Sequence, residues 1–266
     1  MKSIIKIVGI ITMLVLIVLS ITNCGESKQK NIQSITRFLE KHEPTSAENP
    51  ANLAVEMILG NLESADSGWG QLMNALSTWG GYVNLDISTS TMSTSTFNPG
   101  RNIYDKIVSV VLPDMITEIA DLILQNWTGI PSISFTDKNT AYSVIDGVIY
   151  SKDQKTIVRA PRVDGSVIIP DGVINIRNNA FLGCWEITSV TIPASVTNIG
   201  FLSFGDCHRL ANVTFLGNIS ESNFDRAAFG TRDNYISNLR DEFFSPNGGP
   251  GNYTRMGQTM WTWRKQ

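Results

Sequence analysis

A repeat of 23 residues constrains the fold of this chain more than any other feature of its sequence. Between Val167 and Ala211, apolar residues recur in the same order in two successive units. The first unit contains Val167, Ile169, Pro170, Val173, Ile176, Phe181, Cys184 and Ile187, and the second contains Val190, Ile192, Pro193, Val196, Ile199, Phe204, Cys207 and Leu210. Self-similarity at a fixed period of about 20 to 50 residues is the sequence signature of a solenoid.

The same register extends in both directions. One further step along the chain reaches Val213, Phe215 and Ile219, and an earlier copy of the whole unit reads Val110, Leu112, Pro113, Ile116, Ile119, Leu124, Trp127 and Ile130. The next coil begins at Ile133 and Phe135, and the longer interval from Ile133 to Val167 gives this coil an insertion of 11 residues. Val83 and Leu85 are predicted to open a degenerate first coil.

Each unit is predicted to form one coil of a ribbon. Val-x-Ile is a short strand whose two apolar side chains point to the same face, and the following Pro ends the strand because it cannot donate to a ladder. A single coil cannot bury its apolar face alone, so stacked coils must share a core between two caps. We therefore predict an α/β fold over residues 82–237, a solenoid of 23-residue coils with one parallel sheet face and an irregular back with short helices.

These units resemble the leucine-rich repeats of the BspA-like bacterial surface antigens, which follow the pattern IPxxVxxIxxxAFxxCxxLxxV. The segment Asp146–Asp153 also resembles a sequence common in that family, DGVLYSKD. The resemblance implies a leucine-rich-repeat fold and adhesion to extracellular matrix components. From the residues themselves, 148–150 and 156–158 are predicted to pair as a hairpin about a turn at 152–155.

The N-terminus predicts export and lipid attachment. Lys2 and Lys6 precede an apolar run too short for a stable membrane span, so residues 1–23 fit a secretory signal peptide. The position of Cys24 resembles the lipobox of bacterial lipoproteins, where a diacylglyceryl group is attached, although Asn23 departs from the usual small residue. This predicts a membrane partner, through the lipid on Cys24, and a location in the cell envelope at the outer membrane or cell surface. The alternative is an ordinary signal peptide followed by an incidental Cys.

The remaining segments are predicted to flank the repeats. The polar residues 24–50 suit a flexible tether, and apolar residues at helical spacing in 52–62 and 69–79 predict a helical N-terminal cap over 51–81. The Ser/Thr-rich stretch Ser88–Thr96 is expected as an exposed loop. Two aromatic-bearing runs about Gly257 predict a hairpin that caps the C-terminal end within residues 238–266.

Composition argues against several classes of function. Charged residues make up 17% of the chain, and without residues 1–23 it carries 19 basic and 24 acidic side chains, so no basic stripe predicts a nucleic-acid partner. The sequence contains no phosphate-binding loop, nucleophile elbow or paired metal ligands. We therefore expect no catalytic residue, metal or cofactor, and no enzyme activity.

The main alternative to a protein without enzyme activity is one that uses cysteine and histidine for catalysis. Cys184 and Cys207 share one repeat position and are expected to be buried, unpaired thiols, while His208 should face solvent because neighbours in an extended segment point to opposite sides. A Cys207–His208 nucleophile is thus disfavoured. The competing hypothesis is a periplasmic enzyme or inhibitor with a site near His208 or the 142–158 insertion.

The candidate binding site is the outward side of the predicted sheet. The residues between the inward strand positions are mostly hydroxyl-bearing and uncharged: Ser109, Val111, Ser132, Ser134, Ser166, Ile168, Ser189, Thr191, Asn212 and Thr214. Solenoids often bind on such faces, whereas a soluble face with good β-propensity and no ligand is the alternative. The predicted function is a cell-surface interaction or adhesion module for an extracellular protein or glycan.

Overall fold

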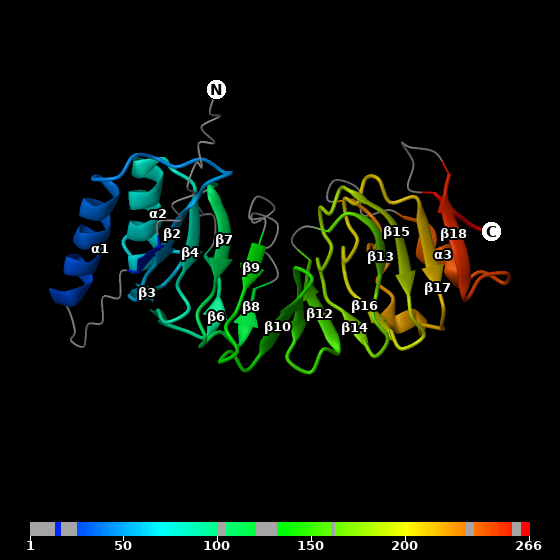
Figure 1. Cartoon of the computed structure of the whole chain (residues 1–266). Helices are drawn as coiled ribbons and strands as arrows, with labels where there is room; N and C mark the ends of the chain where they lie inside the picture. Colours follow the sequence, from blue (N-terminus) through cyan, green and yellow to red (C-terminus); the bar gives the residue numbers. More distant parts are fainter. Residues whose placement is uncertain are drawn as a thin grey trace, which may run out of the picture.

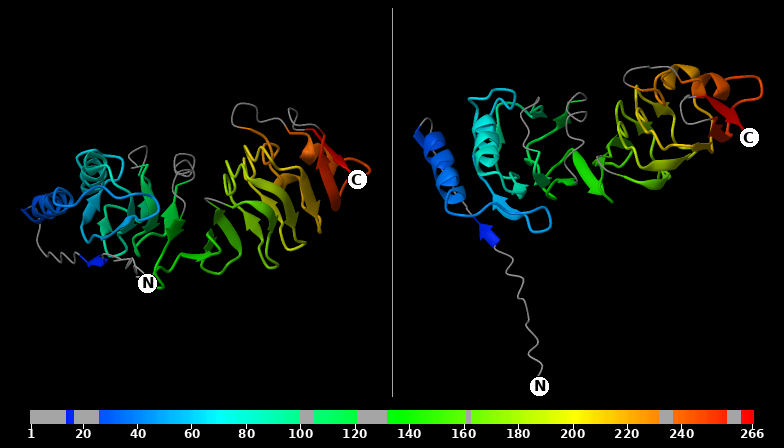
Figure 2. Two further views of the ribbon diagram at one scale, coloured as in Figure 1. Left: turned by 45° about the horizontal axis from the view of Figure 1, so that its top comes forward. Right: turned by 90° about the horizontal axis from the view of Figure 1, so that it is seen from above.

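The computed structural model describes residues 14–16, 26–99, 105–120, 132–160, 163–231, 237–256 and 262–266. These residues form an elongated, curved stack of coils, with two helices at the N-terminal end and two antiparallel strands at the C-terminal end (Figure 1). Helix α1 (Glu26–Leu39) packs beside α2 (Gly68–Trp79), and Figure 2 shows both at the same end of the stack. The predicted solenoid with parallel sheets is confirmed.

Short strands stack along the front of the solenoid in two separate sheets. The N-terminal front sheet has the order β1 (Leu14–Leu16), β2 (Ala51–Ala54), β4 (Val83–Asp86), β7 (Ile107–Val111) and β9 (Ser132–Ser134), all parallel. The C-terminal front sheet has the order β13 (Gly165–Ile168), β15 (Ile187–Ile192), β17 (Asn212–Phe215), β18 (Gly251–Arg255) and β19 (Trp263–Lys265). Its first three strands are parallel, and β18 and β19 continue it antiparallel.

A third sheet, which we call the lower sheet, runs along the bottom of Figure 1. It contains β10 (Tyr142–Ile145), β11 (Val148–Ser151), β12 (Thr156–Arg159), β14 (Asn175–Ile176) and β16 (Asn198–Ile199). In the N-terminal half, two short ladders take the equivalent place after the front strands: β3 (Ile58–Gly60) with β5 (Thr91–Met92), and β6 (Thr96–Phe97) with β8 (Glu118–Ile119). The short helices η2 (Glu221–Asn223) and α3 (Leu239–Phe243) follow β17.

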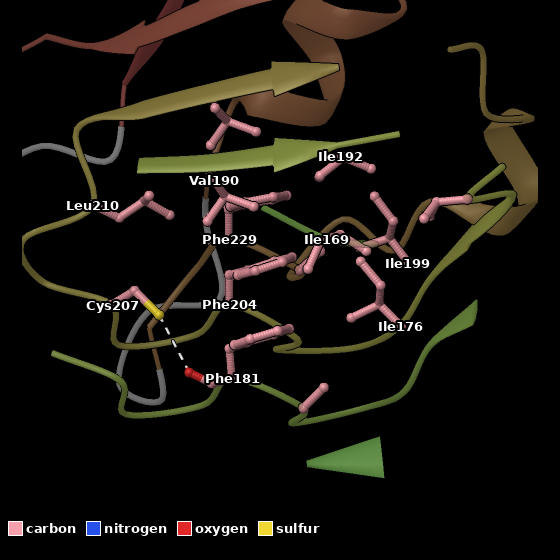
Figure 3. Close-up of a cluster of buried hydrophobic side chains, with 14 of the residues drawn as sticks. Ile169, Ile176, Phe181, Val190, Ile192, Ile199, Phe204, Cys207, Leu210 and Phe229 are labelled. Carbon is pink, nitrogen blue, oxygen red and sulfur yellow. Dashed lines mark hydrogen bonds between the residues drawn. The ribbon is translucent and has the colours of Figure 1, made fainter. Parts of the chain in front are cut away.

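The repeat register translates directly into the core. Val167, Val190 and Val213 are cross-strand partners on β13, β15 and β17, as the repeat period requires. On the opposite side of each coil the repeated Phe positions form a column, in which Phe204 stacks between Phe181 and Phe229 (Figure 3). Both ring pairs have centroids 4.8 Å apart and are nearly parallel, at 6° and 10°. The column links successive coils and is buried throughout.

The 11-residue insertion forms the hairpin β10–β11, and β12 then continues the lower sheet. Asp146 and Gly147 connect β10 to β11 with positive φ angles of 50° and 77°, which is the backbone geometry that a two-residue type I′ hairpin needs. The predicted pairing of β11 with β12 is confirmed. β12 in turn pairs parallel with β14, so that Ile157 and Ile176 lie in one row.

The helix predicted over 52–62 is wrong, because this segment forms β2 and β3. Leu53, Val55, Met57 and Leu59 are all buried, and this period of two is the pattern of a strand with one face in the core. The first coil therefore begins at Ala51 rather than near Tyr82. The helix predicted over 69–79 is confirmed as α2, which Ser67 caps by accepting a hydrogen bond from the Gly70 N–H at 3.1 Å.

Two further segments are more ordered than the sequence suggested. Residues 26–39 of the predicted tether form α1, which buries Ile35 and Leu39 in the N-terminal core. Within the predicted exposed loop 88–96, the Ser90 hydroxyl is buried, donates to the Val55 carbonyl and accepts from the Met57 N–H. The signal for α1 is the amphipathic spacing of its apolar residues, and the signal at Ser90 is a small hydroxyl at a buried turn. The composition of the two segments did not reveal either feature.

Candidate functional site

The six C-terminal residues of the predicted binding face form two rows across one sheet. Ser166, Ser189 and Asn212 are successive cross-strand partners, and Ile168, Thr191 and Thr214 form the second row. All six side chains are exposed or half-buried, while their strand neighbours Val190, Ile192 and Val213 are buried in the core. The alternation of the strands therefore places these six on the outer face of the C-terminal front sheet.

The polar members of these rows hydrogen-bond to one another across the strands. The hydroxyl oxygens of Ser166 and Ser189 are 2.5 Å apart. The Thr214 hydroxyl donates to the Asn252 side-chain oxygen at 2.8 Å, and the Thr254 hydroxyl donates to that of Asn212 at 3.1 Å. These side chains keep free lone pairs and amide donors for a ligand, and their mutual hydrogen bonds fix their orientation without any charge.

Strands β18 and β19 extend this face with residues that sequence reasoning missed. Asn252 continues the Thr214 row, Thr254 continues the Asn212 row, and Arg264 lies opposite Thr254 on the outermost strand. The alternation of Asn252, Tyr253 and Thr254 carried the signal, because Tyr253 is buried between two outward polar residues. Arg264 adds the one positive charge among these outward partners at the C-terminal edge.

The other four predicted residues lie on a different sheet. Ser109 and Ser132 are partners on β7 and β9, as are Val111 and Ser134. Ser109 donates from its hydroxyl to the Asn84 side-chain oxygen at 2.8 Å, and the Asn84 amide donates to Asn52 at 2.9 Å. This amide ladder extends the N-terminal face onto β2 and β4, two strands that the prediction did not include.

The ten predicted residues therefore do not form one continuous stripe. In the described chain, β9 is the last strand of the N-terminal front sheet and β13 is the first strand of the C-terminal one, with no pairing between them. The prediction assumed that the inserted residues would leave the sheet intact. The insertion instead adds strands to the lower sheet, so that the front face is divided into two surfaces of four and six predicted residues.

The cysteine and histidine side chains do not form a nucleophilic pair. Cys207 is fully buried and its Sγ lies 3.3 Å from the Phe181 carbonyl oxygen (Figure 3), whereas His208 is exposed. Cys184 is likewise buried, with its Sγ 3.1 Å from the Ala160 carbonyl oxygen, and both thiols are free. Burial raises the pKa of the Cys184 thiol and raises the pKa of Cys207 well above its ordinary value. Such thiols are poor nucleophiles because the reactive thiolate is disfavoured.

The described residues also supply few groups for other chemistry. Within the described ranges, no three His, Cys, Asp or Glu side chains come together as a metal site. Helices in the same ranges are all too short or too polar to cross a membrane. Cys24, the predicted lipid attachment residue, lies outside the described residues, as do Leu124, Trp127 and Ile130 of the earlier repeat.

A model of one protein family matches the C-terminal half of the solenoid. Residues 165–240 match the BspA type leucine rich repeat region, which includes β13, β15 and β17 and the six C-terminal residues of the binding face. No curated protein matches the chain in sequence.

Three solved structures are similar to part of the chain. A leucine-rich repeat protein from Eubacterium ventriosum is 20% identical over 52% of this chain and 44% of its own length, with a TM-score of 0.39. A leucine-rich cell surface protein from Faecalibacterium prausnitzii is 24% identical over 55% of this chain and 40% of its own, also at 0.39. The pneumococcal vaccine antigen PcpA is 13% identical over 52% and 32%, at 0.35. The chain thus spans less than half the length of each of these proteins.

Proposed function

Residues 165–240 are leucine-rich repeats of the BspA type, and from this we propose that the protein is a non-enzymatic adhesion module of the cell surface. In this proposal the outer face of the C-terminal front sheet docks an extracellular protein or glycan. The partner belongs to a host or to a neighbouring cell. The alternative is a periplasmic enzyme or inhibitor with a site near His208 or the 142–158 insertion, and the exposed His208 beside the buried Cys207 does not favour a nucleophilic pair there.

The observation that carries the proposal is the pair of polar rows on the C-terminal front sheet. Hydroxyl and amide groups repeat from strand to strand at the sheet spacing of about 4.8 Å, and the same groups recur on the flanking strand β18. A periodic, uncharged and prealigned array favours a ligand that is itself extended or repetitive. The rows lack the Trp and Tyr anchors of tight protein interfaces, so we expect weak single contacts that gain strength through multivalency.

A double substitution tests this surface directly. Thr191→Glu with Thr214→Glu places two like charges on adjacent strands at the centre of the face, without entering the core. We expect the variant to remain folded and the attachment of cells or purified protein to matrix proteins and glycans to be lost. Thr197→Glu with Ser222→Glu is the matched control, since both residues are exposed and lie outside the front sheet. Attachment at the parental level by the Thr191/Thr214 variant would exclude this face.

Lipid anchoring at Cys24 is the second part of the proposal. Helix α1 begins two residues after Cys24 and packs on α2, so a lipid there would hold the N-terminal end of the solenoid close to the membrane. Strands β13–β19 lie at the opposite end of the stack (Figure 1), and this arrangement would direct the polar rows away from the cell. Two acyl chains on one glyceryl group would give stable anchoring, whereas one chain is marginal.

Cell fractionation tests the anchor. We expect Cys24→Ala to move the protein from the membrane fraction to the soluble fraction, while Cys184→Ala, which changes a buried thiol in the core, should leave it in the membrane fraction. If the Cys24 variant stays as firmly attached as the parent, the lipid does not hold the protein.

A further inference from the structure

A groove lies where the insertion hairpin meets the first strand of the C-terminal front sheet. Its volume is about 370 Å³, and its lining includes Ile145, Val148, Tyr150, Val163, Val167 and Ile168. Five consecutive residues, 166–170, line the groove, and the first three belong to β13. Because side chains alternate between the two faces of a strand, a groove that contacts three in succession on β13 must run along the edge of this strand. The buried side chains of Ile157 and Phe181 also line it.

This edge of β13 has no partner strand among the described residues. β13 pairs with β15 on one side only and is the terminal strand of its sheet. The N–H groups of Gly165 and Ile169 point toward β15. They donate to the carbonyl oxygens of Glu186, the residue before β15, and of Thr191 on β15. Hydrogen-bonding direction alternates along a strand, so the N–H and C=O groups of Ser166 and Ile168 point along the open edge.

The open edge of β13 carries no Lys or Pro within Gly165–Ile168, and the register shift of this strand lies at its start, between Gly165 and Ser166. Native proteins cover such edges or place Lys, Pro or a bulge on them, because unpaired N–H and C=O groups are a template for another strand. Here Ile168 is 74% exposed, the highest value among the large apolar side chains described, and Ile145 on the facing wall is 40% exposed. Ile168 on the unpaired edge and Ile145 on the opposite wall of the groove are both exposed. Together they favour an apolar partner at this point.

The charges at the groove restrict the partner further. Asp146 at the β10–β11 turn and Asp164 before β13 both line it, and the described lining residues include no Lys, Arg or His. A carboxylate on each wall favours a cation on the occupant.

We propose that the open edge of β13 binds an extended peptide segment of another protein, which adds to the sheet as a strand. The segment carries alternating apolar side chains, which enter the groove between Ile145 and Ile168, and Lys or Arg side chains, which face Asp146 and Asp164. Main-chain hydrogen bonds to Ser166 and Ile168 supply affinity, and the groove supplies selectivity, as in other cases of strand addition. This site shares Ser166 and Ile168 with the two rows of the proposed function, but it uses the edge of β13, whereas the rows lie on the face of the sheet.

Synthetic peptides test this proposal with residues 24–266, the chain that remains if the predicted signal peptide is removed. The probe is a fluorescent, end-blocked octapeptide of alternating Val and Lys, measured by fluorescence anisotropy. An octapeptide of alternating Ala and Lys keeps the charge but cannot fill the groove. A third peptide, N-methylated on alternate residues, keeps the side chains but loses main-chain donors. We expect the Val/Lys peptide to bind with a dissociation constant below about 1 mM and both comparison peptides to bind at least tenfold more weakly.

Substitutions in the protein locate the binding. Ile168→Asp should weaken the Val/Lys peptide at least tenfold, and Ile168→Pro should do the same by removing an N–H that β15 does not use. Leu216→Asp is the control, since Leu216 is 58% exposed and lies outside the groove. The Thr191→Glu, Thr214→Glu variant should still bind the peptide, so failure of the adhesion face and failure of this site can be separated. Equal binding of the three peptides, no binding at all, or a dimer that Ile168→Asp dissociates would each overturn the proposal.

Discussion

At the scale of single residues, the repeated Phe position contributes most clearly to the stability of the solenoid. Phe204 is fully buried and contacts the ring of a neighbouring coil on each side. Parallel offset rings at this separation add a favourable interaction to the burial of their apolar area. The same repeat period that predicts the coil places each ring above the next, so one side chain couples three coils.

Removing this ring should be costly. We expect Phe204→Ala to lower the free energy of unfolding by about 3–5 kcal/mol, because the rigid column cannot close around the cavity. Phe201→Ala is the control: Phe201 is three residues away and 38% exposed, so its loss should cost less than about 1.5 kcal/mol. Denaturant unfolding followed by circular dichroism measures both. Equal effects of the two substitutions would contradict the assignment of the Phe column as the core.

The buried thiols make a prediction about pH. Burial raises the pKa of Cys184 and Cys207 in the folded state, whereas thiols in the unfolded chain ionise near pH 8.5. Their contribution to stability is therefore complete below about pH 8.5 and is lost as pH rises above it.

The burial of both thiols also predicts their reactivity. A maleimide reagent should modify neither thiol in the native protein, even at pH 9, and both in denaturant without reductant. Absence of labelling in denaturant would indicate a disulfide.

At the scale of elements, the segments that could be predicted from the sequence are those with a regular repeat. Strands β13, β15 and β17 and their rows could be predicted because Val, Ile and Pro recur at fixed spacing. Strands β2 and β3 were mistaken for a helix because Leu53, Met57 and Ile58 also match helical spacing, and only burial of alternate residues separates the two patterns. The division of the front face could not be predicted, since the length of an insertion says how much chain is added and not which sheet receives it.

Ser90 shows how a polar residue in a turn can hold two elements together. It is buried just before β5, donates to the Val55 carbonyl at 2.8 Å and accepts from the Met57 N–H at 3.1 Å, and both partners lie in the segment between β2 and β3. We expect Ser90→Ala to destabilise the protein by about 1–3 kcal/mol, because both backbone groups lose their buried partner. Ser93→Ala, at an exposed position of the same stretch, should change stability by less than about 0.5 kcal/mol. Thermal unfolding of both variants measures the difference, and a neutral Ser90→Ala would contradict this role.

At the scale of the whole molecule, the two ends of the solenoid differ. The N-terminal end carries α1 and α2, and the strand β1 there belongs to residues 1–23, so cleavage of a signal peptide would remove it and leave β2 as the edge strand. The C-terminal end closes with β18 and β19, which extend the front sheet and add Asn252, Thr254 and Arg264 to its outer face. The proposed anchor at one end and the polar sheet at the other would together give the arrangement that an adhesion module needs.

Attachment of whole cells tests the central claim most directly. Cells that carry the protein and otherwise identical cells that lack it are compared on a panel of immobilised matrix proteins and glycans, with the purified chain added as a competitor. We predict that at least one ligand retains only the cells that carry the protein, and that the purified chain reduces this attachment in proportion to its concentration. Equal attachment of both kinds of cells to every ligand would contradict the account.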